Sequence, residues 1–346
     1  MPRVIDAFCH ILPPKYEETR WARAGSQDFA AFSPAHLAFV RAGGNAPINY
    51  RTLVDLDTRF KMMDEFEGYQ QILSIAGPPP EVIAPEASVD LCAIVNDELA
   101  GLIAKHPTRF AGAVGAVPMN DPDRACREID RALGELGLNG VQIFTNVNGK
   151  PLDLPEFRPI FATLAKHRKP ILLHPARSQK HADYSAETSS KFLIWQIFGW
   201  PYESSAAMMR LVFGGVLDDH PDLQIVVHHT AAMLPFFYGR MNSMFTLFES
   251  QLTAERGTPL SQPLQQFRRF YADTSVYTPG SIDCARDFLG ADHIVFGTDA
   301  PFDATGGRSS IKGAVDAVMR STCSEVERQK IFHENAMRMF GVAAHT

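Results

Sequence analysis

The sequence predicts an α/β fold, in which a single domain over residues 1–346 forms a (β/α)8 barrel of the TIM type. Three observations support this prediction. Short apolar runs alternate with amphipathic stretches, there are about eight such pairs, and several of the runs end in a histidine or an aspartate. Strands that alternate with helices indicate parallel strands joined by right-handed crossovers, and about eight such units close into a barrel.

Each apolar run is predicted to be a strand because it is short and is bounded by glycine, proline or polar residues. In chain order the expected strands are 3–8, 71–75, 110–117, 140–144, 170–174, 224–228, 270–273 and 293–296. An open, doubly wound sheet is the alternative, but it would have a glycine-rich phosphate loop after the first strand. The segment in that place, Phe8 to Pro13, contains no glycine, which disfavours a nucleotide-binding fold.

The stretches between the strands carry apolar residues three and four positions apart, which is the pattern of a helix with one buried face. The clearest stretch, 88–103, has Leu91 and Val95 on one side. Asp121 followed by Pro122 is typical of a helix start, as a cap and a first-turn proline. The other helices are expected at 58–68, 121–136, 154–167, 205–217, 235–251, 281–289, 311–319 and 325–340.

Two long segments, near 15–58 and 176–204, show no clear period. A stretch of this length inside a compact domain is usually functional or contains small elements of its own. We expect both insertions to cap the C-terminal face of the barrel. They contain Trp21, Trp195 and Trp200, which either exclude water from the site or belong to the core.

The composition argues against several classes of function. Of the 346 residues 45% are hydrophobic, the formal net charge is -6, and no basic cluster suggests binding to nucleic acid. No apolar stretch approaches the roughly 20 residues needed to span a membrane. No signal peptide is expected, because the chain enters a strand at Arg3. The five cysteines are scattered without a Cys-x-x-Cys pair, which suits the reducing cytoplasm.

Chemically active side chains stand at the C-terminal ends of the predicted strands. His10 follows the first strand, His174 ends the fifth, His228 and His229 end the sixth, and Asp299 follows the eighth. The active site of a (β/α)8 barrel forms at this end. Zinc accepts imidazole nitrogen and carboxylate oxygen, and catalytic sites usually keep three protein ligands and one open position. His10, His174 and Asp299 are therefore predicted metal ligands, with a neighbouring histidine as general acid or base.

Motifs along nearly the whole chain resemble those of one family. The motifs are Asp6-x-x-x-His10 with Pro13, Leu173-His174-Pro175, His229 six residues before Pro235, Gly239-Arg240, Gly297-Thr298-Asp299-x-Pro301-Phe302, and Asn335-Ala-x-Arg338-x-Phe340-Gly341. In order and spacing they are similar to the aminocarboxymuconate-semialdehyde decarboxylase-like branch of the amidohydrolase superfamily, also called amidohydrolase 2. They are specific for the branch and not for a substrate.

The resemblance implies a (β/α)8 barrel with one divalent metal ion, usually zinc and sometimes manganese. Most members of the branch are nonoxidative decarboxylases of aromatic or unsaturated carboxylic acids, and some are hydratases or hydrolases. The implied activity is therefore that of a carbon–carbon lyase on a small-molecule carboxylic acid. A metal-dependent hydrolase or hydratase is the alternative on the same scaffold. A homodimer is also expected from the family.

The resemblance also assigns roles to individual residues. His174 and Asp299 would be metal ligands, and His10 would be the second histidine of the opening pair. His229 would be the catalytic histidine, acting beside Asp299, because its distance to Pro235 fits the family pattern.

Three arginines are candidates for binding the substrate carboxylate. Arg240 matches an arginine that in relatives can reach across a dimer. Arg51 matches another carboxylate-binding arginine if a short gap is allowed, and Arg177 is a candidate because it closely follows the fifth strand.

His228 and Cys9 are expected to point away from the site. His228 sits one residue deeper on its strand than His229, and successive side chains of a strand point to opposite faces. The same alternation separates Cys9 from Phe8. We therefore expect His228 to be structural.

Phe8 is the main departure from the family pattern. The family usually opens with His-x-His, and Phe8 takes the place of the first histidine without offering a metal-binding atom. Three interpretations stay open. In the first, His10, His174 and Asp299 hold the metal and a water molecule takes the fourth position. In the second, His229 or Cys9 replaces the missing ligand. In the third, the site binds metal poorly, and the protein is a non-catalytic binding barrel with a decayed metal site.

Overall fold

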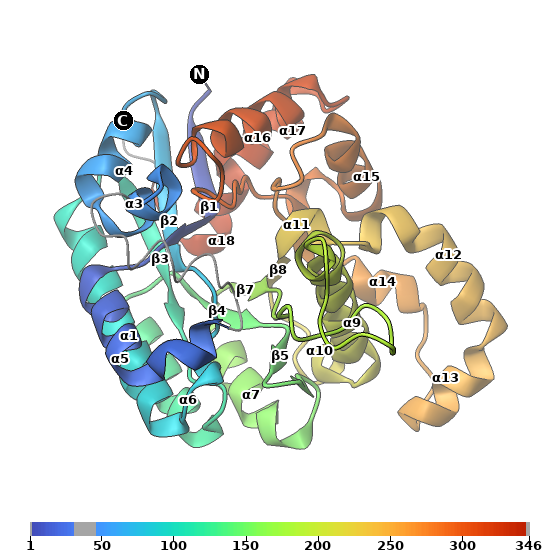
Figure 1. The fold of residues 1–346 in the computed structure, drawn as a ribbon. Coiled ribbons are helices and arrows are strands. Elements are labelled where there is room, and N and C mark those ends of the chain that lie inside the picture. The colour runs from blue at the N-terminus through green and yellow to red at the C-terminus, as the bar shows by residue number, and fades with distance from the viewer. Residues whose placement is uncertain (1, 31–45, 344–346) are drawn as a thin grey trace.

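Parallel strands form the centre of the molecule (Figure 1). The computed structural model describes residues 2–30 and 46–343. In this part of the chain seven parallel strands lie side by side in the order β1-β2-β3-β4-β7-β8-β9. They are β1 Val4–Ile11, β2 Tyr69–Ile75, β3 Phe110–Ala116, β4 Gly140–Phe144, β7 Ile171–His174, β8 Ile225–Val227 and β9 Tyr271–Ala272. A small antiparallel pair, β5 Asn146–Val147 and β6 Lys150–Pro151, follows β4.

The segment 294–296 closes the barrel between β9 and β1. Val295 N donates to Ala272 O of β9 at 2.9 Å, and Ala7 N of β1 donates to Phe296 O at 2.8 Å. The segment therefore occupies the eighth strand position, and the sheet returns on itself. The predicted (β/α)8 barrel is confirmed, and all eight predicted strands lie at strand positions of the barrel.

β1 is longer than the sequence predicted. It continues to Ile11 instead of ending at Phe8. His10 pairs with Ser74 of β2, and its backbone N–H donates to Ala300 O at 2.8 Å on the other side. His10 thus projects from a strand that is held on both edges and not from a loop.

Both faces of the barrel strands are buried, as expected for parallel strands enclosed by helices. Residues at alternate positions fill the barrel interior, and their neighbours point outward to the helices. The interior set is Ile5, Phe8, Ile72, Val114, Leu172, Val226 and Val295. The outward set includes Val4, Cys9, Leu73, Leu173, Val227 and Ile294. In β1 the register shifts between Asp6 and Cys9, so that Ala7 and Phe8 both belong to the interior cluster. Cys9 lies on the outer side, opposite to Phe8, as expected.

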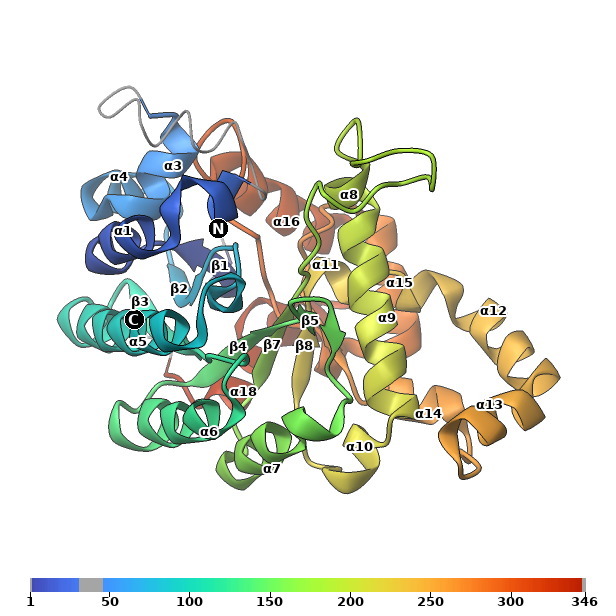
Figure 2. The same ribbon diagram turned by 60° about the horizontal axis from the view of Figure 1, so that its bottom comes forward.

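Helices surround the strands (Figures 1 and 2). The longer ones that follow the strands are α5 Pro85–Lys105, α6 Pro122–Asp130, α7 Arg158–His167, α9 Gly199–Phe213, α12 Leu234–Leu247, α15 Pro279–Leu289 and α16 Arg308–Arg320. Shorter ones are α10 Val216–Asp219, α11 His228–Ala231, α13 Glu249–Arg256, α14 Pro263–Phe267, α17 Glu325–Gln329 and α18 Asn335–Phe340. Asp121 caps α6 as predicted, because its side chain accepts a hydrogen bond from Arg124 N.

The first insertion is more regular than the sequence suggested. It contains α1 Pro14–Ala30, α3 Ile48–Val54 and the start of α4 Leu56–Met63, while positions 31–45 lie outside the described residues. Tertiary contacts hold α1 against α5, since the backbone N–H groups of Lys15 and Tyr16 donate to the Glu98 carboxylate at 3.1 and 2.7 Å. Contacts of this kind leave no periodic signal in the sequence.

The second insertion ends in a helix that begins earlier than predicted. Positions 176–193 are largely irregular, α8 spans Ile194–Ile197, and α9 already starts at Gly199, where the prediction started at Ser205. Figure 2 shows the irregular segment projecting beyond α8 at one end of α9. Among the described residues, no helix is long and apolar enough to cross a membrane.

Candidate metal centre and active site

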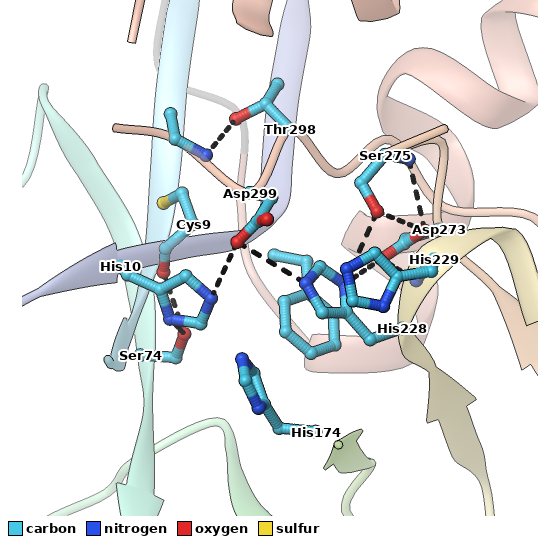
Figure 3. A network of polar contacts seen from close by, with 12 residues as sticks. Cys9, His10, Ser74, His174, His228, His229, Asp273, Ser275, Thr298 and Asp299 are labelled. Carbon is cyan, nitrogen blue, oxygen red and sulfur yellow. Dashed lines mark hydrogen bonds and ion pairs between the residues drawn. The ribbon is translucent and has the colours of Figure 1, made fainter. Parts of the chain in front are cut away.

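Three histidines and an aspartate from four strand ends converge at the mouth of the barrel (Figure 3). His10 comes from β1, His174 ends β7, His228 directly follows β8, and Asp299 follows the segment 294–296. Ring nitrogens of His10, His174 and His228 lie within 4.8 Å of one another. Asp299 Oδ1 lies 3.2 Å from His10 Nε2 and 3.4 Å from His228 Nε2. His10 and His174 thus cluster with His228, which the sequence did not propose as a ligand, and Asp299 lies beside His10 and His228.

Each of the three imidazoles is held through its Nδ1 atom. His10 Nδ1 lies 2.8 Å from Ile75 O, and His174 Nδ1 lies 2.9 Å from Pro175 O. His228 Nδ1 is hydrogen-bonded to the Asp273 carboxylate. Because these oxygens accept from Nδ1–H, Nε2 is the atom left on each ring to take a proton or a metal ion. Metal-binding histidines in proteins are usually oriented in this way.

The donor set fits one divalent metal ion. Metal–nitrogen bonds of roughly 2.0–2.1 Å in a tetrahedral site place neighbouring donor atoms about 3.4 Å apart, close to the 3.2 and 3.4 Å measured around Asp299 Oδ1. His10 Nε2 and His228 Nε2 are buried without a hydrogen-bond partner. Buried polar atoms without a partner are costly, so a cation between them would supply the missing interaction.

His228 does not point away from the site as the sequence predicted. β8 ends at Val227, and His228 continues the alternation of Val226, which faces the barrel interior. His229 reaches the same region because the chain turns sharply there, with left-handed backbone angles at His229 (φ 59°) and Thr230 (φ 56°). The two imidazole centroids lie 3.9 Å apart, and both rings have a nitrogen near Asp299. The prediction failed because it treated His229 as strand.

Asp273 fixes this turn, and sequence reasoning did not assign it to the site. Besides the bond to His228, its carboxylate accepts hydrogen bonds from the backbone N–H groups of His229 (3.2 Å), Thr230 (2.7 Å) and Ser275 (3.1 Å). A signal for it was present, since Asp273 ends the seventh apolar run just as His174 ends the fifth.

Asp6 connects β1 to the segment that carries Asp299. Its carboxylate accepts hydrogen bonds from Phe8 N at 3.2 Å and from Thr298 N at 3.1 Å, as well as from the hydroxyl groups of Thr298 and Tyr69. Burial raises the pKa of Asp6 to about 7, against the effect of these donors. Asp6 therefore ties the strand that carries His10 to the segment that carries Asp299.

The charges of the site are unevenly distributed. Burial lowers the pKa of His228, but the carboxylates of Asp273 and Asp299 outweigh it and raise the pKa to about 9. Burial, together with the neighbouring His228, lowers the pKa of His229 to about 3. Burial would raise the pKa of Asp299, yet His228 and His10 hold it well below its usual range. At neutral pH the site therefore presents an ionised carboxylate and a neutral His229, and the field at His228 favours positive charge.

A cavity of about 540 Å³ opens onto the cluster. His229 and Asp299 line it, and Trp200 of the second insertion, Tyr277 and Phe302 contribute aromatic walls. The second insertion therefore caps the site in part, as predicted. None of the described residues that line the cavity is a lysine or an arginine. His228 is fully buried and is not among the lining residues.

The predicted substrate arginines do not line this cavity within one chain. Arg240 is exposed on α12, and Arg51 is exposed on α3. Arg177 is mostly buried and pairs with Glu203 at 2.8 Å. Cys9 is likewise not part of the site, because its Sγ lies 3.6 Å from Ile72 O on the outer side of the barrel.

Comparison with known proteins places the chain in one family. A sequence profile described as Amidohydrolase matches residues 5–342. Gamma-resorcylate decarboxylase of Rhodococcus jostii (strain RHA1) is 30% identical over 303 residues, which cover 83% of this chain and 88% of that protein. The corresponding enzyme of Polaromonas sp. (strain JS666 / ATCC BAA-500) is 31% identical over 300 residues, with 83% and 88% covered.

Solved structures show the same fold. A 2,6-dihydroxybenzoate decarboxylase in complex with 2,6-dihydroxybenzoate superposes with a TM-score of 0.78 at 26% identity, over 99% of this chain and 100% of that chain. A dihydroxybenzoic acid decarboxylase of Polaromonas sp. JS666, with bound manganese and the inhibitor 2-nitroresorcinol, has a TM-score of 0.78 at 25% identity, over 99% and 97%. This protein therefore belongs to the amidohydrolase 2 family, the decarboxylase branch of the amidohydrolase superfamily.

Proposed function

We propose that this protein is a metal-dependent nonoxidative decarboxylase of an aromatic carboxylic acid that carries a hydroxyl group next to the carboxylate. The observation that carries the proposal is the cluster of His10, His174 and His228 nitrogens at the barrel mouth, with Asp299 3.2 Å from His10 and an aromatic cavity beside it. The relatives reported above are decarboxylases of dihydroxybenzoic acids, and their family covers nearly the whole chain.

His10, His174 and Asp299 are the proposed metal ligands. Imidazole nitrogen and carboxylate oxygen suit zinc, which makes zinc the first candidate. Manganese is the second, because the related enzyme of Polaromonas sp. JS666 holds it. When bound, the metal would supply Lewis acidity toward the oxygen atoms of the substrate.

His229 is the proposed proton carrier. It lines the cavity and its Nδ1 atom is buried without a hydrogen-bond partner, so the ring has a free nitrogen for a proton that enters from solvent. In decarboxylation a proton must reach the ring carbon that bears the carboxylate, which becomes tetrahedral; loss of carbon dioxide then restores the aromatic ring. Asp299, also at the cavity, stabilises the positive charge that His229 gains while it carries the proton.

The second subunit of a homodimer is proposed to complete the substrate site. Substrate carboxylate needs a cationic partner, and the described lining of the cavity has no lysine or arginine. Arg240 is exposed on α12, where Phe236 is 76% exposed, and Phe198 at the start of α9 is 69% exposed. Large exposed apolar side chains of this kind favour a protein–protein interface. Arg51 and Arg177 remain secondary candidates, and Arg177 already has Glu203 as its partner.

The cytoplasm is the proposed location. The five cysteines are all free, which agrees with a reducing compartment.

Hydrolysis or hydration on the same scaffold is the second candidate, since the same residues can serve those reactions. The names of the relatives favour decarboxylation. A decayed, non-catalytic site is disfavoured by the three imidazoles, which are all still oriented through Nδ1.

Parallel assays separate these possibilities. The protein, loaded with zinc or with manganese, is given 2,6-dihydroxybenzoate and other hydroxybenzoates, and carbon dioxide release is measured beside ring opening of aromatic lactones. We expect carbon dioxide from at least one hydroxybenzoate and no lactone opening. Lactone opening alone would support the hydrolase, and neither reaction would support a binding barrel.

A further inference from the structure

Phe8 occupies the place of a metal ligand and packs directly on His228. The two rings are stacked, with centroids 4.0 Å apart and planes inclined by 5°. The Phe8 centroid also lies 5.8 Å from that of His10 and 6.2 Å from that of His174. Phe8 is thus a wall of the metal cluster that offers no donor atom, and it fixes the plane of the His228 ring.

His228 is oriented toward the cluster from two further directions. Its Nδ1 atom is hydrogen-bonded to the buried Asp273 carboxylate, with Ser275 Oγ 3.4 Å away. Its Nε2 atom is buried, has no hydrogen-bond partner and lies 3.4 Å from Asp299 Oδ1. A carboxylate on Nδ1 and a free Nε2 facing other donors is the usual arrangement of a metal-bound histidine.

His228 and His229 face different environments. His229 lines the cavity, whereas His228 is fully buried behind it. A substrate in the cavity could therefore contact His229 but not His228. The nitrogen atoms of His10 and His174, by contrast, lie within 4.8 Å of a nitrogen of His228.

We propose that His228 is a fourth protein ligand of the metal, supplying the donor that position 8 lacks, while His229 alone serves the substrate. The proposal rests on the metal dependence proposed above. It assigns the two adjacent histidines to separate tasks, and it makes Phe8 a positioning residue that holds the His228 ring. The chain would thus keep four protein donors, namely His10, His174, His228 and Asp299.

Metal affinity, measured without reference to activity, tests this assignment. The best variant is His228→Asn, because the amide nitrogen can replace Nδ1 as donor to Asp273 while the Nε2 atom is deleted. We expect wild-type protein to hold about one equivalent of zinc by elemental analysis, and His228→Asn to bind it about 100-fold more weakly or worse in a chelator competition. The matched control, His229→Asn, should bind zinc as the wild type does.

Cobalt substitution reports on the ligands directly. The visible absorption bands of bound Co²⁺ should change in position and intensity in His228→Asn and stay unchanged in His229→Asn. Unfolding by urea shows whether each variant is folded. If His228→Asn fails to fold, Phe8→Ala in the wild-type background is measured in its place. Without the stacked ring that holds His228, the Co²⁺ bands should change, and unchanged bands would overturn the proposal.

A double variant supplies the decisive comparison. Adding Phe8→His to His228→Asn should raise the zinc affinity at least ten-fold above that of His228→Asn alone, because position 8 then offers a donor atom beside the lost one. Unchanged zinc affinity and Co²⁺ spectrum in His228→Asn, with metal lost in His174→Ala, would overturn the role of His228 and leave the metal-dependent function intact. A wild-type protein that binds no divalent metal would overturn both.

Discussion

At the scale of single residues, the site depends on a turn that separates two adjacent histidines. A strand would have sent them to opposite faces, but the left-handed angles of His229 and Thr230 bring both to Asp299. Non-glycine residues adopt such angles only when their surroundings compensate the cost. Here the Asp273 carboxylate does so by accepting the backbone N–H groups of the turn.

His229→Gln tests the division of tasks through catalysis. Loss of the imidazole that carries the proton should lower kcat by roughly two to four orders of magnitude, while the metal content stays at the wild-type level. Carbon dioxide release and elemental analysis on the same sample measure the two quantities. A variant that kept its kcat would exclude His229 as the proton carrier.

Glu81 makes stability depend on pH independently of the site. It is 1% exposed, and burial raises its pKa to about 8, against a smaller effect of nearby backbone N–H groups. Because the folded-state pKa exceeds the unfolded value, the folded chain binds the extra proton. The contribution of the neutral Glu81 side chain to the free energy of unfolding is therefore fully present below about pH 4.5 and is lost as the pH rises toward 8.

Glu81→Gln should therefore remove the fall in the free energy of unfolding that the ionisation of Glu81 causes. Between pH 4.5 and 8.5 the free energy of unfolding of the wild type should fall relative to the variant by about 3–5 kcal/mol. Urea unfolding at both pH values measures it. The exposed Glu86 of α5 provides the control, since Glu86→Gln should leave the pH dependence as it is. Parallel pH profiles of wild type and Glu81→Gln would contradict the explanation.

At the scale of elements, the second insertion forms a wall of the active site. Trp200 in α9 lies 5.9 Å from His174 and 6.0 Å from His229 between ring centroids, and its indole N–H donates to Arg177 O. The insertion therefore contributes to the substrate cavity through an aromatic face.

Trp200→Ala should lower kcat/KM by about ten-fold or more, mainly through a higher KM, because about 1.4 kcal/mol or more of apolar contact with the substrate is lost. Steady-state kinetics with the best hydroxybenzoate measures the change. Trp200→Phe keeps an aromatic face and should recover most of the affinity. Equal kinetics for all three proteins would show that the insertion does not contact the substrate.

The elements also show what the sequence could predict. Short apolar runs identified all eight strand positions, because parallel strands buried on both faces need such runs. α1 was missed because contacts with α5 hold it. The places of His10, His174 and Asp299 near one another followed from the strand ends. His228 was misplaced because its direction relative to His229 depends on a turn whose angles the sequence does not reveal. Asp273 was overlooked although it ends a predicted strand in the same way as His174.

At the scale of the whole molecule, the proposed dimer supplies a cation to a cavity whose described lining residues include no lysine or arginine. Arg240 lies on α12, which stands beside the barrel in Figure 1 and exposes Phe236. In the proposed symmetric pair, each Arg240 would reach the partner's cavity, and exposed side chains such as Phe236 would be covered, since a two-fold interface uses the same patch twice.

Mixed dimers test this arrangement. Arg240→Ala and His229→Gln should each be nearly inactive alone. When the two variants are unfolded together and refolded as an equal mixture, half of the dimers contain one subunit of each variant. One of the two sites in such a dimer then has both an intact His229 and an intact Arg240. Roughly a quarter of wild-type activity should then return. No recovery, with dimers confirmed by mass, would place Arg240 outside the partner's site.

The measurement that tests the central claim most directly is carbon dioxide release from the best hydroxybenzoate of the panel before and after metal removal. We expect release by protein that holds about one equivalent of zinc or manganese, its loss after chelation and its return when the metal is restored. His174→Ala and Asp299→Ala should hold little metal and release none. Release that persists in fully metal-free protein would contradict the metal-dependent mechanism.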